Sequence, residues 1–330
     1  MRVLVTGGAG YVGGFTARHL RASGHEVTVI DDLSMGHAPA APPGTLTVCD
    51  IADRDQVGAL LRDRRIEAVL HFAAFSSVAN SVREPMAYWR NNVAGTLALL
   101  EAMQARSVER IVFSSTASVY GETAEMPLPE TAALAPESPY ATTKLSAERM
   151  LADFARAYGL RHVILRYFNA AGASADGAHG EHHDPETHLI PILLQTQLGL
   201  RPRLTVYGDD FPTPDGTCVR DYVHVQDLAE AHASALDWTA HAPAGAGEAM
   251  NLGSGTGHSV LEVVRAAERV TGKRVDFERG PRRPGDTARL VASAAKAGRV
   301  LGWRPRADLD EIVATAWKWH QSHPRGYTRE

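Results

Sequence analysis

A tyrosine and a lysine stand four residues apart in the stretch SPYATTKLSAERM, which runs from Ser138 to Met150. On a helix, residues at this spacing lie one above the other on the same face. A tyrosine in water has a pKa of about 10 and is a poor base at neutral pH, but a neighbouring ammonium group stabilises its phenolate. The pair Tyr140 and Lys144 is therefore a candidate for removing a proton from a substrate alcohol, although two ordinary residues on a helix face would look the same.

A segment rich in hydroxyl groups, FSSTASVYG, precedes this pair in the chain. It ends the apolar run Arg110–Ser115, which is typical of a strand in a parallel sheet. Because the carboxyl ends of parallel strands share one edge, Thr116 would face the same crevice as Tyr140. Thr116 could then orient a substrate hydroxyl and share its proton.

A glycine-rich turn near the start of the chain offers a place for a hydride acceptor. Gly7, Gly10 and Gly13 lie between the apolar run Arg2–Thr6 and the helical segment Tyr11–Ser23. Glycines allow the backbone to approach a pyrophosphate, and the helix N-terminus supplies free N–H groups and a positive dipole end. This position predicts a dinucleotide site more than an ordinary surface turn.

Acidic residues after the second predicted strand indicate which dinucleotide binds. Asp31 and Asp32 follow the run Glu26–Ile30. A carboxylate there accepts hydrogen bonds from the adenosine ribose and repels the extra phosphate of NADP, so the sequence favours NAD. After the third and fourth strands, Asp50 and Ile51 would frame the adenine and the segment Phe72–Ser76 would lie along the cofactor, with ordinary β–α loops as the alternative.

Short apolar runs alternate with helical segments up to residue 168, which predicts a doubly wound parallel α/β sheet of the Rossmann type. The remaining predicted strands are Thr45–Val48, Glu67–Phe72 and His162–Tyr167, and the remaining helices of this part are Asp53–Arg64, Pro85–Ala105 and Tyr140–Tyr158. Beyond it we predict a short strand LTVYG and helices at Leu189–Gln197, Val225–Trp238, Val260–Thr271, Ala292–Leu301 and Leu309–His320. We expect a cofactor domain over residues 1–168, to which residues 223–238 return, and a smaller mixed α/β substrate domain at the C-terminal end, over residues 169–330.

Composition excludes several classes of protein. The net charge of −4 gives no basic surface for nucleic acid, and two cysteines exclude a disulfide framework or a thiolate metal cluster. The start MRVLVTGG has no signal-peptide core, and no apolar run has the length of a membrane span. We expect a soluble cytoplasmic protein that binds neither nucleic acid nor membrane.

The strings TGGAGYVG and SPYATTK resemble those of the extended short-chain dehydrogenase/reductase superfamily. The strings NNVAGT, LRYFNAAGA, DDFPTPDGTCVRDYVHVQDLA, NLGSGTGHSV and PRRPGD narrow the resemblance to its NAD-dependent epimerase/dehydratase family, and within it to UDP-glucose 4-epimerases. The resemblance implies that a UDP-sugar is transiently oxidised at C4 by tightly bound NAD and then reduced on its other face. It also implies a homodimer formed through the helices Pro85–Ala105 and Tyr140–Tyr158.

The resemblance further implies a role for individual residues. The catalytic set is Tyr140 as base, Lys144 and Thr116. Cofactor contacts fall at Gly7, Gly10, Tyr11, Val12, Gly13, Asp31, Asp50, Ile51, Phe72, Ala73, Ala74, Asn91, Tyr140, Lys144 and Phe168. Substrate contacts fall at Thr116, Asn169, His188, Leu189, Thr205, Val206, Tyr207, Arg220, Arg283 and Asp286, where arginine suits a diphosphate by its planar donor fork.

Three positions depart from the family pattern. Ser76 replaces a lysine near the NAD phosphates, and His188 replaces an asparagine that contacts the substrate. Leu290 stands where a tyrosine or a smaller residue lines the sugar pocket, so we hypothesise partial room for N-acetylated sugars. A 4-epimerase of another UDP-sugar, UDP-N-acetylglucosamine or UDP-arabinose, is accordingly the alternative function.

The sequence gives less support to a dehydratase, a non-catalytic regulator or a metal site. A dehydratase needs an acid and a base after the strand-end hydroxyl, where this chain has Ala117 and Ser118, and a non-catalytic NAD-binding regulator has no need of the catalytic set. The string EHHDPETH invites a metal site, but Pro185 interrupts the spacing of its histidines, which does not suit two ligands on one helix face. We expect no metal. Of Trp317 and Trp319 we expect one to be buried and the other partly exposed.

Overall fold

The computed structural model describes residues 1–122, 126–283 and 286–328. Its largest element is a parallel seven-stranded sheet with the strand order β10-β6-β5-β4-β1-β2-β3. The strands are β1 (Arg2–Thr6), β2 (Glu26–Asp31), β3 (Leu46–Val48), β4 (Ala68–His71), β5 (Arg110–Thr116), β6 (Arg161–Tyr167) and β10 (Gly247–Leu252). The doubly wound α/β fold predicted from the sequence is confirmed.

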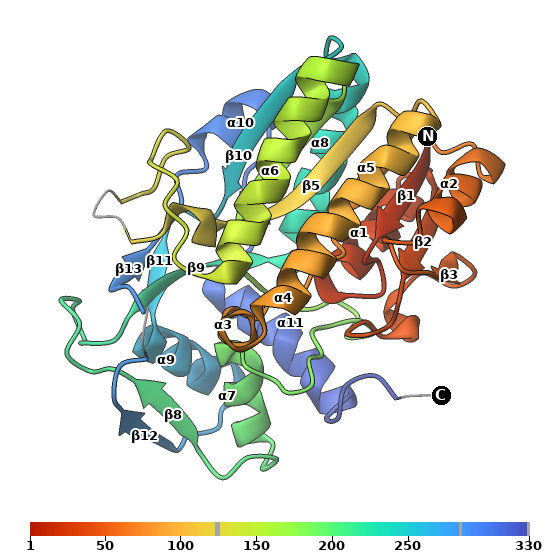
Figure 1. The fold of residues 1–330 in the computed structure, drawn as a ribbon. Coiled ribbons are helices and arrows are strands. Elements are labelled where there is room, and N and C mark those ends of the chain that lie inside the picture. The colour runs from red at the N-terminus through yellow and green to blue at the C-terminus, as the bar shows by residue number, and fades with distance from the viewer. Residues whose placement is uncertain (123–125, 284–285, 329–330) are drawn as a thin grey trace.

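Helices cover both faces of this sheet because its strands are apolar on both sides. One face packs against α1 (Tyr11–Ala22), α8 (Val225–His241) and α10 (Ala295–Leu301). The other packs against α2 (Arg54–Asp63), α5 (Gly95–Ala105) and α6 (Pro139–Tyr158). Figure 1 shows α5 and α6 in front of the sheet and α8 behind it.

The predicted helix Pro85–Ala105 is divided by a π-helical turn. The segments are α3 (Val78–Arg83), α4 (Pro85–Tyr88), the π-turn η2 (Trp89–Ala94) and α5. Asn92, within the π-turn, is buried and donates from Nδ2 to the Phe75 carbonyl (3.0 Å) and to Oγ1 of Thr143 (3.1 Å). The turn thus ties the loop after β4 to α6, and π-turns are often found at functional sites.

The second part of the molecule lies beyond the carboxyl ends of the large sheet's central strands (Figure 1). It contains a four-stranded sheet of β7 (Asn169–Ala171), β9 (Val219–His224), β11 (Gly257–Ser259) and β13 (Arg289–Leu290), and a pair of β8 (Leu204–Tyr207) with β12 (Phe277–Gly280). Helices α7 (Leu189–Gln197), α9 (Val260–Thr271) and α11 (Leu309–Ser322) surround a separate core. Short 3₁₀ turns are η1 (Ala38–Ala40) and η3 (Ala117–Tyr120).

The expectation for the two tryptophans of α11 is wrong. Trp317 is 9% exposed and Trp319 is 0% exposed. Trp317 belongs to the core of the second part, whereas Trp319 stacks on His323 with its ring centroid 3.8 Å away and donates from Nε1 to the carbonyl of Glu181. Because α11 is covered on two sides, positions two apart on it are both buried.

No helix within the described ranges has the length and apolar character that crossing a bilayer requires.

A buried ion pair joins α6 to the sheet. Glu148 of α6 is 4% exposed and Arg166 of β6 is 5% exposed. Nη2 of Arg166 donates to Oε2 of Glu148 (2.6 Å) and Nε donates to its Oε1 (3.0 Å). The hydroxyl of Ser115 donates to the same Oε1 (2.5 Å), so α6 is held beside the end of β5.

We predict that Arg166→Met lowers the free energy of unfolding by about 3–5 kcal/mol, because it leaves the Glu148 carboxylate buried without its partner. Urea unfolding followed by circular dichroism measures the loss. Arg156→Met is the matched control, since Arg156 pairs with Asp153 on the exposed face of α6 and should matter little. Equal stability of the two variants would contradict the prediction.

Candidate active site

The glycine turn between β1 and α1 has room for nothing larger than hydrogen at two positions. Gly7 has φ of +70°, and a Cβ there would lie 2.5 Å from the backbone nitrogen of Ala73. A Cβ on Gly13 would lie 2.3 Å from the carbonyl oxygen of Gly7. Gly10 is the N-cap of α1, and no side chain caps that helix end. The turn therefore presents backbone N–H groups without side-chain cover, which fits a pyrophosphate.

Asp31, at the end of β2, is next to this turn. Its Oδ2 accepts the N–H of Ala9 (3.0 Å) and its Oδ1 accepts the N–H of Leu33 (2.9 Å). Burial raises the pKa of this carboxyl, although the two backbone N–H groups oppose the shift. Each carboxylate oxygen has a further lone pair, so the residues present fit an adenosine ribose beside the turn.

Tyr11 and Val12 join the turn to the rest of the molecule through their side chains. Oη of Tyr11 donates to the carbonyl of Gly172 (2.6 Å), which belongs to the second part, and burial raises the pKa of its phenol. Val12 packs on the core beneath α1. Their side chains are thus occupied, and any contact with a phosphate falls to their backbone N–H groups.

The residues predicted to contact the adenine and the rest of the cofactor lie close to strand ends. They differ in how deeply they are buried and in which groups they contact. Ile51 is 4% exposed and packs in the core, while Oδ1 of Asp50 accepts the N–H of Ala52. Phe72 packs against the ring of His232 with centroids 4.7 Å apart. Ala73 and Ala74 follow it, and Asn91 donates to its buried neighbour Asn92.

Asn92 is a residue that the sequence analysis missed. It holds the loop after β4 by accepting the N–H of Phe75 (2.8 Å). Asn92 belongs to the string NNVAGT, which carries part of the family resemblance. The periodicity of a regular helix gave no reason to expect that its buried side chain would hydrogen-bond this loop.

The catalytic set meets where β5 and α6 approach each other. Ser138 caps α6 by accepting the N–H of Ala141 (3.2 Å), and Pro139 favours the first turn. Tyr140 and Lys144 then point from the buried side of α6, with exposed fractions of 9% and 4%. Tyr140 lies close enough to the side chain of Thr116, the last residue of β5, for the two to interact.

Lys144 is held by the strand and not by the tyrosine. Its Nζ donates to the carbonyl oxygen of Ser114 (2.8 Å) and lies 4.8 Å from the centroid of the Phe113 ring. Burial lowers the pKa of Lys144 to about 7, although Glu148 one helical turn away raises it. Glu148 and the Ser114 carbonyl were not singled out from the sequence.

The residues of the chain do not by themselves lower the pKa of Tyr140. From the sequence we expected the ammonium group of Lys144 to stabilise the phenolate and so lower this pKa. Burial is the largest cause and raises that pKa well above its usual value, and the nearby Tyr167 raises it further. The nearby side chain of Thr116 opposes the shift. The phenol is thus kept neutral until a further positive charge stabilises its phenolate.

The second part brings together the residues predicted to bind a nucleotide diphosphate. Nη2 of Arg220 lies 3.4 Å from Oδ1 of Asp286, and Nε of Arg283 lies 3.1 Å from Oδ2 of the same carboxylate. The guanidinium of Arg283 stands 5.0 Å from the ring centroid of Tyr207. A partly shielded cluster of two cations, one carboxylate and one aromatic ring results.

The other predicted substrate residues lie on neighbouring elements. Asn169 begins β7 and pairs with Tyr222 of β9. His188 and Leu189 stand at the start of α7, and Thr205 and Val206 belong to β8 beside Tyr207. Thr205 contacts Glu278 across the strand pair, and Val206 is buried.

Phe168 and Leu290 share one hydrophobic cluster with residues beside the catalytic set. The cluster includes Ala117, which follows Thr116, and Leu145, which follows Lys144. Leu290 is only partly buried there. Its side chain therefore packs near the catalytic set, where the sequence analysis expected the sugar pocket.

The family model and the relatives that match this chain indicate the same family. Residues 3–253 match the NAD dependent epimerase/dehydratase family. A UDP-glucose 4-epimerase of Streptomyces lividans is 50% identical over 329 residues, covering 99% of this chain and 98% of the relative. One of Lacticaseibacillus casei is 47% identical over 330 residues, covering 99% of both chains.

Solved structures agree in fold over the whole chain. A UDP-glucose-4-epimerase from Stenotrophomonas maltophila with bound NAD and formylated UDP-arabinopyranose has a TM-score of 0.95 and 43% identity, covering 98% of this chain and 99% of that one. One from Brucella ovis in complex with NAD has a TM-score of 0.93 and 46% identity, covering 96% and 97%. With these matches across its length, the chain belongs to the NAD dependent epimerase/dehydratase family.

Proposed function

We propose that this protein is an NAD-dependent isomerase that interconverts UDP-galactose and UDP-glucose by epimerisation at C4. The observation that carries the proposal is that buried Tyr140 lies beside Thr116 at the end of β5, in the same sheet whose first strand leads into the glycine turn. Full-length similarity to UDP-glucose 4-epimerases supports the substrate.

Each residue of the catalytic set has its own role in this reaction. Thr116 orients the sugar 4-hydroxyl, and Tyr140 takes its proton and later returns it. Bound NAD supplies the hydride acceptor and donor, and its positive ring supplies the charge that the phenolate needs. Lys144, anchored on Ser114, is placed to bind a ribose hydroxyl while remaining beside Tyr140.

Epimerisation requires that the 4-keto sugar turn over before it is reduced. We propose that the UDP group stays fixed during this step through Arg220 and Arg283, whose planar donor forks suit a diphosphate, while Asp286 meets the ribose. Binding energy placed on UDP leaves the sugar loosely held. Backbone groups of β8 near Thr205–Tyr207 would meet the uracil.

The two parts of the molecule would then have separate tasks. We assign cofactor binding to residues 1–168, together with the α8 segment that packs on α1, and UDP-sugar binding to residues 169–330. Strand β10 also belongs to the large sheet, so the second half of the chain contributes to both parts.

A homodimer in the cytoplasm completes the proposal. Apolar side chains are exposed along α3 to α5: Val82 and Met86 at 64% each, Trp89 at 42% and Leu97 at 39%. Exposed apolar side chains on consecutive helical segments favour a partner, and the family resemblance favours a second copy. Sedimentation as a monomer at micromolar concentration would contradict the dimer.

The function is tested by incubating purified protein with UDP-galactose and no added NAD. UDP-glucose should appear without net NADH, because the cofactor is regenerated in each turnover and stays bound. The same assay with UDP-N-acetylgalactosamine and UDP-arabinose measures the substrate range, including the hypothesis about Leu290. Failure to form UDP-glucose even after NAD is supplied would refute the epimerase proposal.

We predict that Tyr140→Phe lowers kcat by about 10²–10⁴-fold, because it removes the base and keeps the ring. NAD and UDP binding, measured by isothermal titration calorimetry, should be nearly unchanged. Tyr158→Phe is the matched control, since Tyr158 ends the same helix and is 57% exposed. Near-normal turnover by Tyr140→Phe would show that the pair merely occupies one face of α6.

A further inference from the structure

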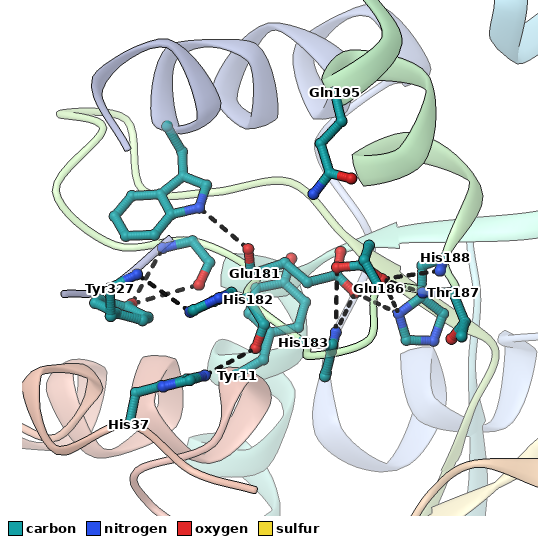
Figure 2. Close-up of polar contacts among 12 residues, drawn as sticks. Tyr11, His37, Glu181, His182, His183, Glu186, Thr187, His188, Gln195 and Tyr327 are labelled. Carbon is teal, nitrogen blue, oxygen red and sulfur yellow. Dashed lines mark hydrogen bonds and ion pairs between the residues drawn. The ribbon is translucent and has the colours of Figure 1, made fainter. Parts of the chain in front are cut away.

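Four side chains converge in the loop before α7, and only one of them, His188, is among the predicted substrate contacts. Glu181, His183, Glu186 and His188 each direct one ligand-type atom toward the others, and these four atoms all lie within 4.8 Å of one another. Figure 2 shows the two carboxylates and the two imidazoles facing a common centre. Nothing in the proposed reaction uses this cluster as a whole.

The objection raised from the sequence does not apply to this arrangement. It assumed that His183 and His188 would have to share a helix face across Pro185. In the structure the whole stretch 181–188 is irregular, and α7 begins only at Leu189. The loop folds back on itself, so the two histidine rings lie with centroids 4.9 Å apart.

The two carboxylates are buried and firmly positioned. Glu181 is 5% exposed and Glu186 is 7% exposed. Trp319 donates to the backbone carbonyl of Glu181 (3.1 Å). Oε1 of Glu186 accepts the N–H groups of Thr187 (2.8 Å) and His188 (2.9 Å), and each of its two oxygens faces one histidine of the cluster.

The separations inside the cluster are longer than hydrogen bonds in three of four cases. Nδ1 of His183 lies 3.4 Å from Oε1 of Glu181 and 3.6 Å from Oε2 of Glu186, and Nδ1 of His188 lies 3.5 Å from Oε1 of Glu186. Nδ1 of His183 is buried and makes no hydrogen bond. Only the contact between His188 and Glu181, at 2.6 Å, is a short hydrogen bond.

Three of these four distances are close to the spacing of ligand atoms around a small tetrahedral cation, and the contact of His188 with Glu181 is shorter. With metal–ligand bonds of about 2.0–2.1 Å, tetrahedral ligand atoms stand about 3.3–3.4 Å apart. We propose that Glu181, His183, Glu186 and His188 form a structural Zn²⁺ site. Two imidazole nitrogens and two carboxylate oxygens are a donor set that zinc accepts, and four protein ligands close the site.

The position of the cluster indicates what the metal would do. His182, between two of the ligands, stacks on His37 from the cofactor part with centroids 4.2 Å apart and accepts the N–H of Tyr327 near the C-terminal end. The ligand His188 directly precedes α7. Zinc would therefore fix a loop that connects both parts of the molecule and the start of α7.

The competing interpretation is a network of ion pairs between two protonated histidines and two carboxylates, with no metal. It accounts for the short contact of His188 with Glu181. It places Nδ1 of His183 at 3.4 Å and 3.6 Å from the two carboxylates, without a well-aligned hydrogen bond to either. The two interpretations differ in one measurable property, specific zinc binding.

The test uses the full-length protein, freed of any affinity tag and dialysed against a chelator. Competition with a chromophoric chelator and elemental analysis should find one Zn²⁺ per chain, with a rise in the unfolding temperature of several degrees. His183→Gln and Glu186→Gln should each weaken binding by about 100-fold or more, because each removes a ligand. His241→Gln, which changes an exposed histidine at the end of α8, is the matched control and should bind as the unaltered protein does.

Co²⁺ gives a second readout that does not depend on the variants folding. The unaltered protein should show the strong visible absorption of four-coordinate Co²⁺, and Zn²⁺ should abolish it. Absence of that absorption, or zinc binding by His183→Gln or Glu186→Gln equal to that of the control, would overturn the site in favour of the ion-pair network.

Discussion

Burial of a phenol and an ammonium group on one face of α6 is the constraint on which the rest of the structure depends. Tyr140 and Lys144 are 9% and 4% exposed, and removal from water disfavours the charged form of both. The tyrosine is therefore held neutral, and the pKa of the lysine is lowered to about 7. Such a site transfers protons only when an added charge and hydrogen bonds replace the stabilisation of charged groups that burial removes.

The surrounding structure supplies that support from several elements. The end of β5 contributes the Ser114 carbonyl to Lys144 and places the Thr116 side chain near Tyr140. Behind them, the ion pair of Glu148 with Arg166 fixes α6 against β6, and Asn92 in the π-turn fixes it from the other side through Thr143. The positions of the catalytic groups thus depend on contacts made away from the reacting atoms.

Periodicity in the sequence was enough to predict strands β1 to β6 and most helices of the first half, but it missed α3 and the π-turn before α5. The predicted helices Leu189–Gln197 and Val260–Thr271 also coincide with α7 and α9, because strong apolar faces and clear end signals mark them. Strand β10 was missed, since only its second half, Met250–Leu252, is buried and its run is short. Its place in the large sheet depends on pairing with β6, a contact distant in sequence.

Prediction of the candidate site had the same limit, because contacts distant in sequence could not be predicted. The glycine turn and the Tyr140–Lys144 pair have local patterns that can be read along the chain. By contrast, the partners of Lys144 and the convergence of Glu181, His183, Glu186 and His188 depend on how loops fold. A rule about helix faces was misleading for those histidines because no helix is present there.

The central claim is that Tyr140 becomes a base only when a positive charge is placed beside it. The most direct measurement is the ultraviolet absorbance of tyrosinate as pH is raised, taken as the difference between the unaltered protein and Tyr140→Phe, with either NAD⁺ or NADH bound. We predict that the pKa of Tyr140 lies below the free-tyrosine value of about 10 with NAD⁺ and above it with NADH, whose ring is neutral. The same pKa in both forms would contradict this account.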